Sequence, residues 1–152
     1  MSENPPGETE LSPAALRAVE LAGGEAMALR HPFLGTEHLV IGVAAQAEEA
    51  GGRTALEQAP HLLRRELVRV IAPGGTPCAQ LPTLTRRART VLRLARDEAR
   101  RRGQPRLGVH HLVWGLVSVE EGSALRVLRA LDVDLPHARE RARAFLDRGM
   151  VD

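Results

Sequence analysis

The chain has 152 residues, of which 43% are hydrophobic and only 2% aromatic, so leucine, valine and alanine must supply most of a core. Its one cysteine excludes an internal disulfide and a multi-cysteine metal site, and no apolar run approaches the roughly 20 residues that a membrane helix needs. The 21 basic residues are all arginines, and the net charge of +2 combines an acidic first half with a basic second half.

The first predicted elements lie in residues 1–35. Residues 1–10 are polar and acidic and lack the apolar run of a secretory signal, so we expect a flexible terminus on a soluble, cytoplasmic protein. A helix is predicted to follow, because Ser12 is a good N-cap and Pro13 suits the first helical position. Gly23-Gly24 predicts a kink or soft spot in it. Apolar residues at helical spacing predict its buried face: Leu16, Val19 and Ala26.

Three further helices are predicted before residue 73. Thr36 is expected to cap one that runs through "HLVIGVAA", a short one is expected at 53–59, and another at 61–71. The Pro- and Gly-rich residues 73–83 predict a linker, so that residues 11–72 form one unit.

Residues 84–148 predict a second unit of four helices. Thr85 is expected to cap a helix that Gly103 ends, and the next helix is expected to begin near Val109. A third is predicted at 123–131, and Asp134 is placed to cap a fourth at 135–146. Small and branched apolar residues predict the buried face of the first helix: Ala88, Val91, Leu92, Ala95 and Ala99.

The two units repeat each other at a constant offset of 73 residues. Residues 11–44 and 84–117 align without a gap and share 13 identities in 34 positions. The alignment matches "LGTEHLVIGV" with "LGVHHLVWGL", and Glu37 is replaced there by His110. Each unit alone buries too little apolar surface for stability. We therefore predict an all-α monomer in which two four-helix repeats pack into one domain about a pseudo-two-fold axis.

These motifs resemble the N-terminal Clp repeat domain of Clp-type AAA+ unfoldases. The similarity rests on "LTRRAR", "ARDEAR", "LGVHHLVWGL" and "GSALRVLRAL" in the second unit and on "GTEHL" in the first, and it covers about residues 11–147. The resemblance implies an all-helical domain that receives substrates and adaptor proteins and hydrolyses nothing. With no lysine, the chain cannot contain the phosphate-binding loop of a motor. We expect a stand-alone recognition domain without ATPase modules or cofactors.

The resemblance also implies two classes of ligand. In some family members the glutamate of "GTEH" holds the guanidinium group of a phosphoarginine tag, which a carboxylate can do through a bidentate pair and an imidazole cannot. Other members bind hydrophobic cyclic peptides between the repeats. We therefore predict a peptide- and protein-binding accessory, adaptor or decoy in Clp-dependent proteolysis, whose partners are substrates or adaptors of Clp-type ATPases. The predicted ligand-binding residues are Leu11, Thr36, Glu37, Leu84, Thr85, Arg89, Arg93 and His110.

Other interpretations stay open. The arginines of 86–102 form either a solvated helix face or a phosphate-binding surface, so the alternative function is an Arg-rich nucleic-acid-binding regulator. Glu37 is also favourable as a plain first-turn acid. His38 and His111 are expected to be buried and hydrogen-bonded. Adjacent helical residues such as His110 and His111 point about 100° apart, so no metal site is predicted. The sequence shows no spaced nucleophile–base pair or acid pair, so we do not predict an enzyme.

Overall fold

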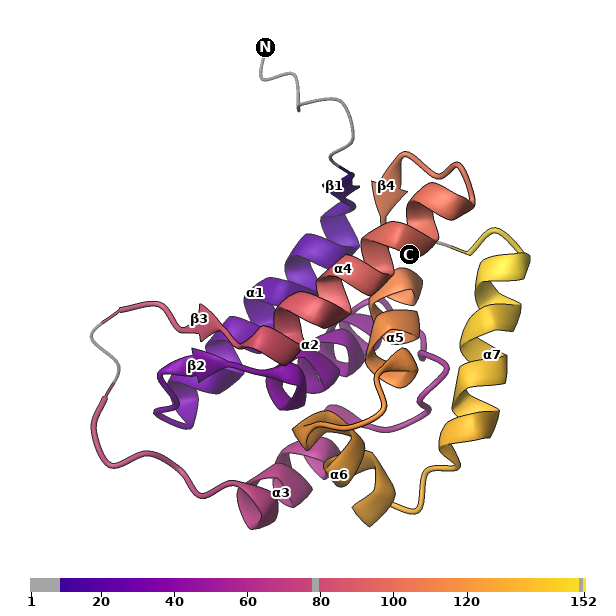
Figure 1. Cartoon of the computed structure of the whole chain (residues 1–152). Helices are drawn as coiled ribbons and strands as arrows, with labels where there is room; N and C mark the ends of the chain where they lie inside the picture. The colour runs from indigo at the N-terminus through magenta and orange to yellow at the C-terminus, as the bar shows by residue number, and fades with distance from the viewer. Residues whose placement is uncertain (1–8, 78–79, 151) are drawn as a thin grey trace.

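The computed structural model describes residues 9–77, 80–150 and 152, and seven helices account for most of these residues (Figure 1). Residues 1–8 of the predicted flexible terminus lie outside this range. In chain order the elements are β1 (Glu10–Leu11), α1 (Pro13–Ala28), β2 (Phe33–Leu34), α2 (Thr36–Glu49), α3 (Pro60–Val70), β3 (Thr83–Leu84), α4 (Arg86–Arg101), β4 (Arg106–Leu107), α5 (Val109–Ser118), α6 (Ser123–Ala130) and α7 (Leu135–Asp147).

Helices α2 and α5 form the centre of the molecule. Both contact α1, α4 and α6, and they also contact each other. Helix α3 packs on α2 and α6, and α7 packs on α5. One cluster of buried side chains runs through both repeats, from Ala15 in α1 to Ala142 in α7. The two repeats therefore share a single core rather than folding as separate domains. Among the described residues no helix is both long and apolar enough to cross a bilayer.

Two pairs of very short parallel strands join the repeats to each other. Leu11 pairs with Leu107 in β1 and β4, and Leu34 pairs with Leu84 in β2 and β3. The offset of 73 residues converts the first pair into the second, which is what a pseudo-two-fold axis between the repeats requires. The predicted all-α double repeat is thus confirmed. The strands themselves were not predicted, and they include Glu10 and Thr83, which we had assigned to the flexible terminus and the linker.

Local capping signals predicted most helix ends correctly. Ser12, Thr85 and Asp134 each accept a hydrogen bond from the backbone N–H three residues later, at 3.0, 3.1 and 3.1 Å. Gly103 follows α4 with φ 65, in the left-handed region that glycine adopts without strain. The caps thus explain why both α1 and α4 begin directly after a strand.

A glycine lets the second helix of each repeat approach the first. A Cβ atom on Gly42 would lie 2.2 Å from the backbone oxygen of Ala18, and a Cβ atom on Gly115 would lie 2.5 Å from that of Val91. The two contacts are again related by the offset of 73 residues. Only glycine permits this separation of the helix backbones at both places.

Two predictions about the first repeat are wrong. Leu16 is 48% exposed, because alanines form the buried face of α1. Helix α1 runs through Gly23-Gly24 as one element, and the kink or soft spot expected there stays a prediction. Residues 53–59 form a turn instead of a helix: the Thr54 hydroxyl accepts the N–H of Leu56, and Glu57 has a left-handed φ of 54. The first repeat therefore has three helices, whereas the second has four.

Candidate functional site

The structure brings Thr36, Glu37 and Thr85 to one cavity between the repeats. The cavity has a volume of about 560 Å³, and Thr36 and Glu37 come from the first repeat, whereas Thr85 comes from the second. Its remaining lining residues all belong to the second repeat: Arg86, Arg87, Glu121 and Ser123. Three of the predicted ligand-binding residues are therefore brought together by packing of the two repeats.

The N-terminal ends of three helices meet at this cavity. Helix α2 begins at Thr36, α4 begins after its cap Thr85, and α6 begins at Ser123. Gly35 is the N-cap of α2, so the prediction that Thr36 is the cap is wrong. The Thr36 hydroxyl instead accepts the backbone N–H of Ala124 in α6, at 3.2 Å. This bond joins two of the three helix ends, which all carry partial positive charge.

Glu37 is the acidic group of the cavity that lacks an arginine partner. Its side chain is 13% exposed, and among the described residues no guanidinium group forms an ion pair with it. Burial raises the pKa of its carboxyl group above the ordinary value. Gly35 makes room for this carboxylate, because a Cβ atom on Gly35 would lie 2.3 Å from Oε2 of Glu37. A cationic ligand group would supply the partner that the carboxylate lacks.

The arginine next to Glu37 in the cavity is already paired. Arg87 binds the carboxylate of Glu121, at 2.6 Å, and both side chains are more than half exposed. Such an exposed pair contributes little stability, typically less than about 1 kcal/mol, and a ligand can replace either partner. Arg86 has no ion-pair partner among the described residues and is exposed. The cavity thus offers one partly buried carboxylate, two guanidinium groups and three helix N-termini.

Buried histidines hold the backbone beside Glu37 in place. The N–H of Gly35 donates to Nδ1 of His38 at 3.0 Å, so Nε2 of His38 carries the proton. That proton is donated to Nδ1 of His31 at 2.9 Å, and Nε2 of His31 donates to the carbonyl of Ala72 at 2.9 Å. Burial lowers the pKa of His38 to about 4, so this ring is neutral at pH 7. The predicted role of His38 as a buried, hydrogen-bonded residue is confirmed.

The second repeat has the same hydrogen bond from glycine to histidine, but a glutamine replaces the second histidine. The N–H of Gly108 donates to Nδ1 of His111 at 2.8 Å, and Nε2 of His111 contacts Oε1 of Gln104 at 2.5 Å. Burial lowers the pKa of His111 to about 4 as well. Gln104 occupies the position that His31 has in the first repeat. The histidine of "G-x-x-H" is thus a structural group in both repeats.

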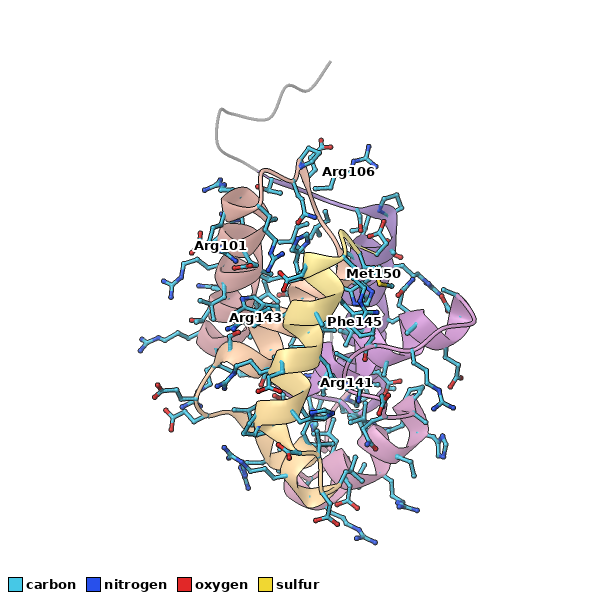
Figure 2. All side chains as sticks on the ribbon, turned by 90° about the vertical axis from the view of Figure 1, so that its right-hand side faces the viewer. Arg101, Arg106, Arg141, Arg143, Phe145 and Met150 are labelled. Atoms are coloured by element: carbon cyan, nitrogen blue, oxygen red, sulfur yellow. The ribbon has the colours of Figure 1, made fainter. Side chains whose placement is uncertain are left out.

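His110, the counterpart of Glu37, is covered instead of lining a cavity. It is 5% exposed, and its ring stacks on Phe145 of α7 with 4.8 Å between the ring centroids. Burial lowers its pKa, and its Nδ1 has no hydrogen-bond partner within the described ranges. Figure 2 shows α7, which carries Phe145, lying across this side of the molecule. The second repeat therefore lacks both the acid and the open surface.

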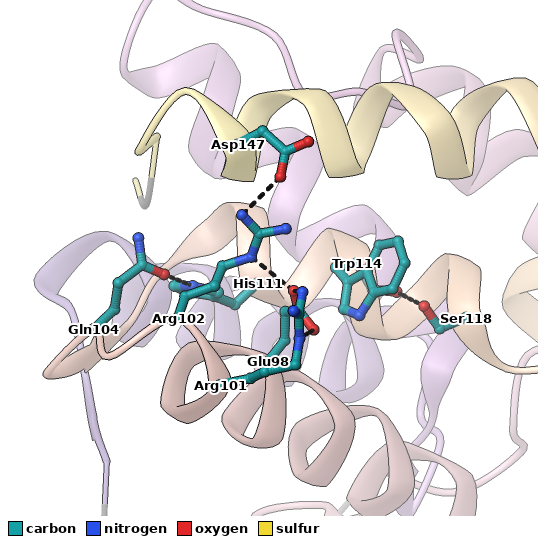
Figure 3. A network of polar contacts seen from close by, with 8 residues as sticks. All are labelled: Glu98, Arg101, Arg102, Gln104, His111, Trp114, Ser118 and Asp147. Carbon is teal, nitrogen blue, oxygen red and sulfur yellow. Dashed lines mark hydrogen bonds and ion pairs between the residues drawn. The ribbon is translucent and has the colours of Figure 1, made fainter.

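An ion-pair network ties α7 to α4 and keeps this cover in place (Figure 3). Arg102 binds Glu98 at 2.7 Å and Asp147 of α7 at 2.9 Å. Its side chain is 16% exposed, and that of Glu98 only 9%. In the first repeat the matching Glu25 pairs with Arg64 of α3, at 2.9 Å between Nε and Oε2. Glu25 thus binds the last helix of its repeat directly, whereas Glu98 is linked to α7 through Arg102.

The other predicted ligand-binding residues lie away from the cavity. Leu11 and Leu84 are half-buried and belong to different strand pairs, which lie at opposite ends of α4 in Figure 1. Arg89 and Arg93 are exposed on α4, beyond the part of the helix that lines the cavity. The structure thus assembles Thr36, Glu37 and Thr85 and separates them from the remaining predicted residues.

Sequence reasoning missed part of the lining. Arg86 and Arg87 directly follow the predicted cap Thr85, so their position at a helix start was a usable signal. Glu121 and Ser123 gave no such signal, because only the packing of α6 against α2 brings them to Glu37. Within residues 9–77, 80–150 and 152, no group of three His, Cys, Asp or Glu side chains is arranged to hold a metal ion.

Comparison with known proteins supports the motif analysis. A family described as the "Clp repeat (R) N-terminal domain" matches residues 83–152. The negative regulator of genetic competence ClpC/MecB from Bacillus subtilis is 34% identical over 134 residues, which cover 87% of this chain and 16% of that protein. The chaperone protein ClpB from Oceanobacillus iheyensis is 32% identical over 134 residues, with the same coverage. The chain thus spans about 16% of the length of these relatives.

Solved structures show the same fold. The N-terminal domain of the chaperone ClpD from Arabidopsis thaliana has a TM-score of 0.77 and 20% identity, with 91% of this chain and 95% of that chain covered. The Hsp104 N-terminal domain from Candida albicans has a TM-score of 0.69 and 14% identity, with 93% of each chain covered. At these identities the likeness extends to the fold alone.

Proposed function

The chain belongs to the Clp repeat N-terminal domain family, and we propose that it is a non-catalytic domain that binds peptides and proteins in Clp-dependent proteolysis. The observation that carries the proposal is the pocket at Glu37, where a carboxylate without an arginine partner faces a cavity formed by both repeats. The cavity, at about 560 Å³, is large enough for an amino-acid side chain.

The proposed ligand group is an arginine side chain that carries a phosphate. A guanidinium group can form a bidentate, charge-assisted pair with the Glu37 carboxylate. The phosphate can accept hydrogen bonds from free N–H groups at a helix start, and it can displace Glu121 from Arg87. Opposite charges in one ligand thus match opposite charges in one cavity. For a hydrophobic cyclic peptide the support is weaker, because Leu11 and Leu84 lie apart.

The proposed site is single. His110 replaces the second glutamate, and Phe145 covers the place where a second ligand would bind. We propose that the domain acts as an accessory to a Clp-type ATPase, either as an adaptor that delivers bound proteins or as a decoy that withholds them. Both roles use the same pocket and differ only in what happens after binding.

Titration with a fluorescent peptide that carries one phosphoarginine tests the pocket. We expect binding by the wild type, a large loss with Glu37→Ala, and a smaller loss with Glu37→Gln, which keeps the shape and removes the charge. Glu20→Ala is the matched control, because Glu20 is an exposed acid on α1 that does not line the cavity. Equal binding by wild type and Glu37→Ala, or no binding by either, would remove the tag hypothesis.

Reconstituted degradation by a Clp ATPase and its protease separates the two roles. Added domain accelerates degradation of a tagged substrate if it delivers, and inhibits degradation in proportion to its concentration if it withholds. Glu37→Ala should remove either effect. No change in rate with the wild-type domain would contradict an accessory role.

A further inference from the structure

Five exposed arginines form a straight row along α4, and we call this row the arginine stripe. They lie three or four residues apart and so share one face of the helix. Over fifteen residues the row is about 21 Å long at 1.5 Å per residue. The residues of the arginine stripe are Arg86, Arg89, Arg93, Arg96 and Arg100.

None of the five guanidinium groups has a carboxylate partner in the part of the chain that the structure describes. Other arginines of the second repeat do have such partners, for example Arg87 with Glu121, and Arg101 and Arg102 with Glu98. Helix α4 is thus able to form ion pairs, but they lie outside the stripe. Five unpaired positive charges so close together repel one another, and an anionic partner would relieve that repulsion.

The first repeat has no equivalent of the arginine stripe. At the five matching positions α1 carries Pro13, Leu16, Glu20, Gly23 and Met27, none of them basic. The buried faces of α1 and α4 agree, since both consist largely of alanine. The stripe is therefore not a requirement of the fold, because the repeat with the same helix packing does without it.

The stripe begins at the proposed pocket. Arg86 lines the cavity that holds Glu37, and the other four arginines lead away from it along α4. A polypeptide that places one side chain in the cavity can therefore continue directly along the stripe. Carboxylate groups of such a polypeptide would form bidentate pairs with guanidinium groups.

The surroundings favour a polypeptide over a single-stranded nucleic acid. Single strands need exposed aromatic rings on which bases stack. The chain has three aromatic residues besides histidine. Arg143 lies 5.5 Å from the ring centre of Trp114, and Arg148 lies 5.6 Å from that of Phe145. The third, Phe33, is 57% exposed, but it is a single ring and lies in β2 instead of α4. No stacking ring accompanies the stripe on α4 itself.

We propose that the arginine stripe is a docking surface for an acidic polypeptide segment, rich in Asp and Glu, that flanks the group bound in the Glu37 pocket. This inference rests on the proposed function for the direction in which the segment runs. The domain would then select proteins that carry a run of acidic residues beside the residue that enters the pocket.

The test uses the whole chain and a fluorescein-labelled, glutamate-rich peptide of about seven residues, which in extended form spans roughly the length of the stripe. The variant Arg89→Gln, Arg93→Gln, Arg96→Gln should bind roughly tenfold more weakly, as expected for the loss of three surface ion pairs. The matched control removes three exposed arginines that also lack ion-pair partners but lie on α3 and α6, namely Arg65, Arg126 and Arg129. It should bind within about twofold of the wild type.

Two further comparisons make the outcome decisive. A peptide with Gln in place of every Glu should not bind, and affinity for the Glu peptide should fall as salt is added. Glu37→Ala should still bind the Glu peptide, so failure of the pocket and failure of the stripe give different results. Equal losses in both triple variants, or tighter stripe-dependent binding of a single-stranded or duplex oligonucleotide than of the peptide, would overturn the proposal.

Discussion

The two repeats have the same interior and different exteriors. Nine of the thirteen identical pairs in the alignment are buried in both copies, among them Gly42 with Gly115 and His38 with His111. At the positions of the arginine stripe, the first helix carries no basic residue in one copy and five arginines in the other. Residues that are identical in the two copies are thus mostly those that the packing requires. Residues that differ lie at positions where binding can evolve without disturbing the core.

The contrast is sharpest at Glu37 and His110. Both residues occupy the second position of equivalent helices and follow a glycine N-cap. One lines a cavity, and the other lies beneath Phe145. Helix α6 packs beside Thr36 of α2 and leaves Glu37 at the cavity, whereas Phe145 of α7 stacks on His110 of α5. One duplicated element can therefore be a ligand site in one copy and part of the core in the other.

The largest effect that tests the shared interior is the dependence of stability on pH. The pKa values of His38 and His111 are about 4 in the folded chain, against an ordinary value of 6.5, because burial disfavours the charged ring. Below pH 6.5 these two rings therefore become protonated in the unfolded chain but stay neutral in the folded chain. The free energy of unfolding should fall between pH 6.5 and pH 4 by about 3 kcal/mol for each ring.

Urea unfolding as a function of pH measures this loss. His38→Gln and His111→Gln should each remove a similar share of the pH dependence in that window, if the two repeats have equivalent interiors. A variant that leaves the pH dependence unchanged would show that the corresponding ring is not held neutral by the fold.

The glycine contacts give the next largest effect. Gly42→Ala and Gly115→Ala each push a Cβ atom against a backbone oxygen, and we expect each to cost about 3 kcal/mol of unfolding free energy. The contact at Gly42 is the closer one, so its substitution should cost more. Chemical denaturation measures both values.

Gly24→Ala is the control for these substitutions. Gly24 lies within α1, and a Cβ atom added there would meet no other atom within 4 Å, so alanine should stabilise the chain by up to about 1 kcal/mol. Similar effects at all three glycines would mean that helix propensity, and not close packing, explains the paired glycines.

The smallest effect on stability comes from exchanging the residues that distinguish the two copies. His110→Glu should cost roughly 2 kcal/mol, because it places a carboxylate beneath Phe145. It should not create a second site for phosphoarginine, since the surface there stays covered. Glu37→His should leave stability within about 1 kcal/mol and abolish binding. A second binding site in His110→Glu would show that the residue type alone, and not the cover by α7, decides which repeat binds.

The sequence predicted the features that depend on neighbouring residues. Caps at Ser12, Thr85 and Asp134 follow from local spacing and were correct. The buried stripe of α4 was also correct, except that Leu92 is only partly buried. The constant offset between the copies also carried real three-dimensional information, because it predicted the pseudo-two-fold axis.

Some of the failures involve contacts between distant segments, and others involve local turn chemistry. Thr36 was predicted to be a cap, but its hydroxyl accepts a hydrogen bond from the N–H of Ala124 in α6, 88 positions away in the chain. The turn at 53–59 depends on a left-handed Glu57, and the strand pairs join segments of different repeats. In the candidate site, Glu37 was predictable from its motif, whereas Glu121 and Ser123 come from a loop and a helix start that no motif connects to it.

The stoichiometry of phosphoarginine binding tests most directly whether the pocket at Glu37 is the one binding site. Isothermal titration calorimetry should give one site per chain for the wild type, the same site for His110→Ala, and no site for Glu37→Ala. Two sites per chain, or unchanged binding by Glu37→Ala, would contradict the assignment of recognition to the first repeat.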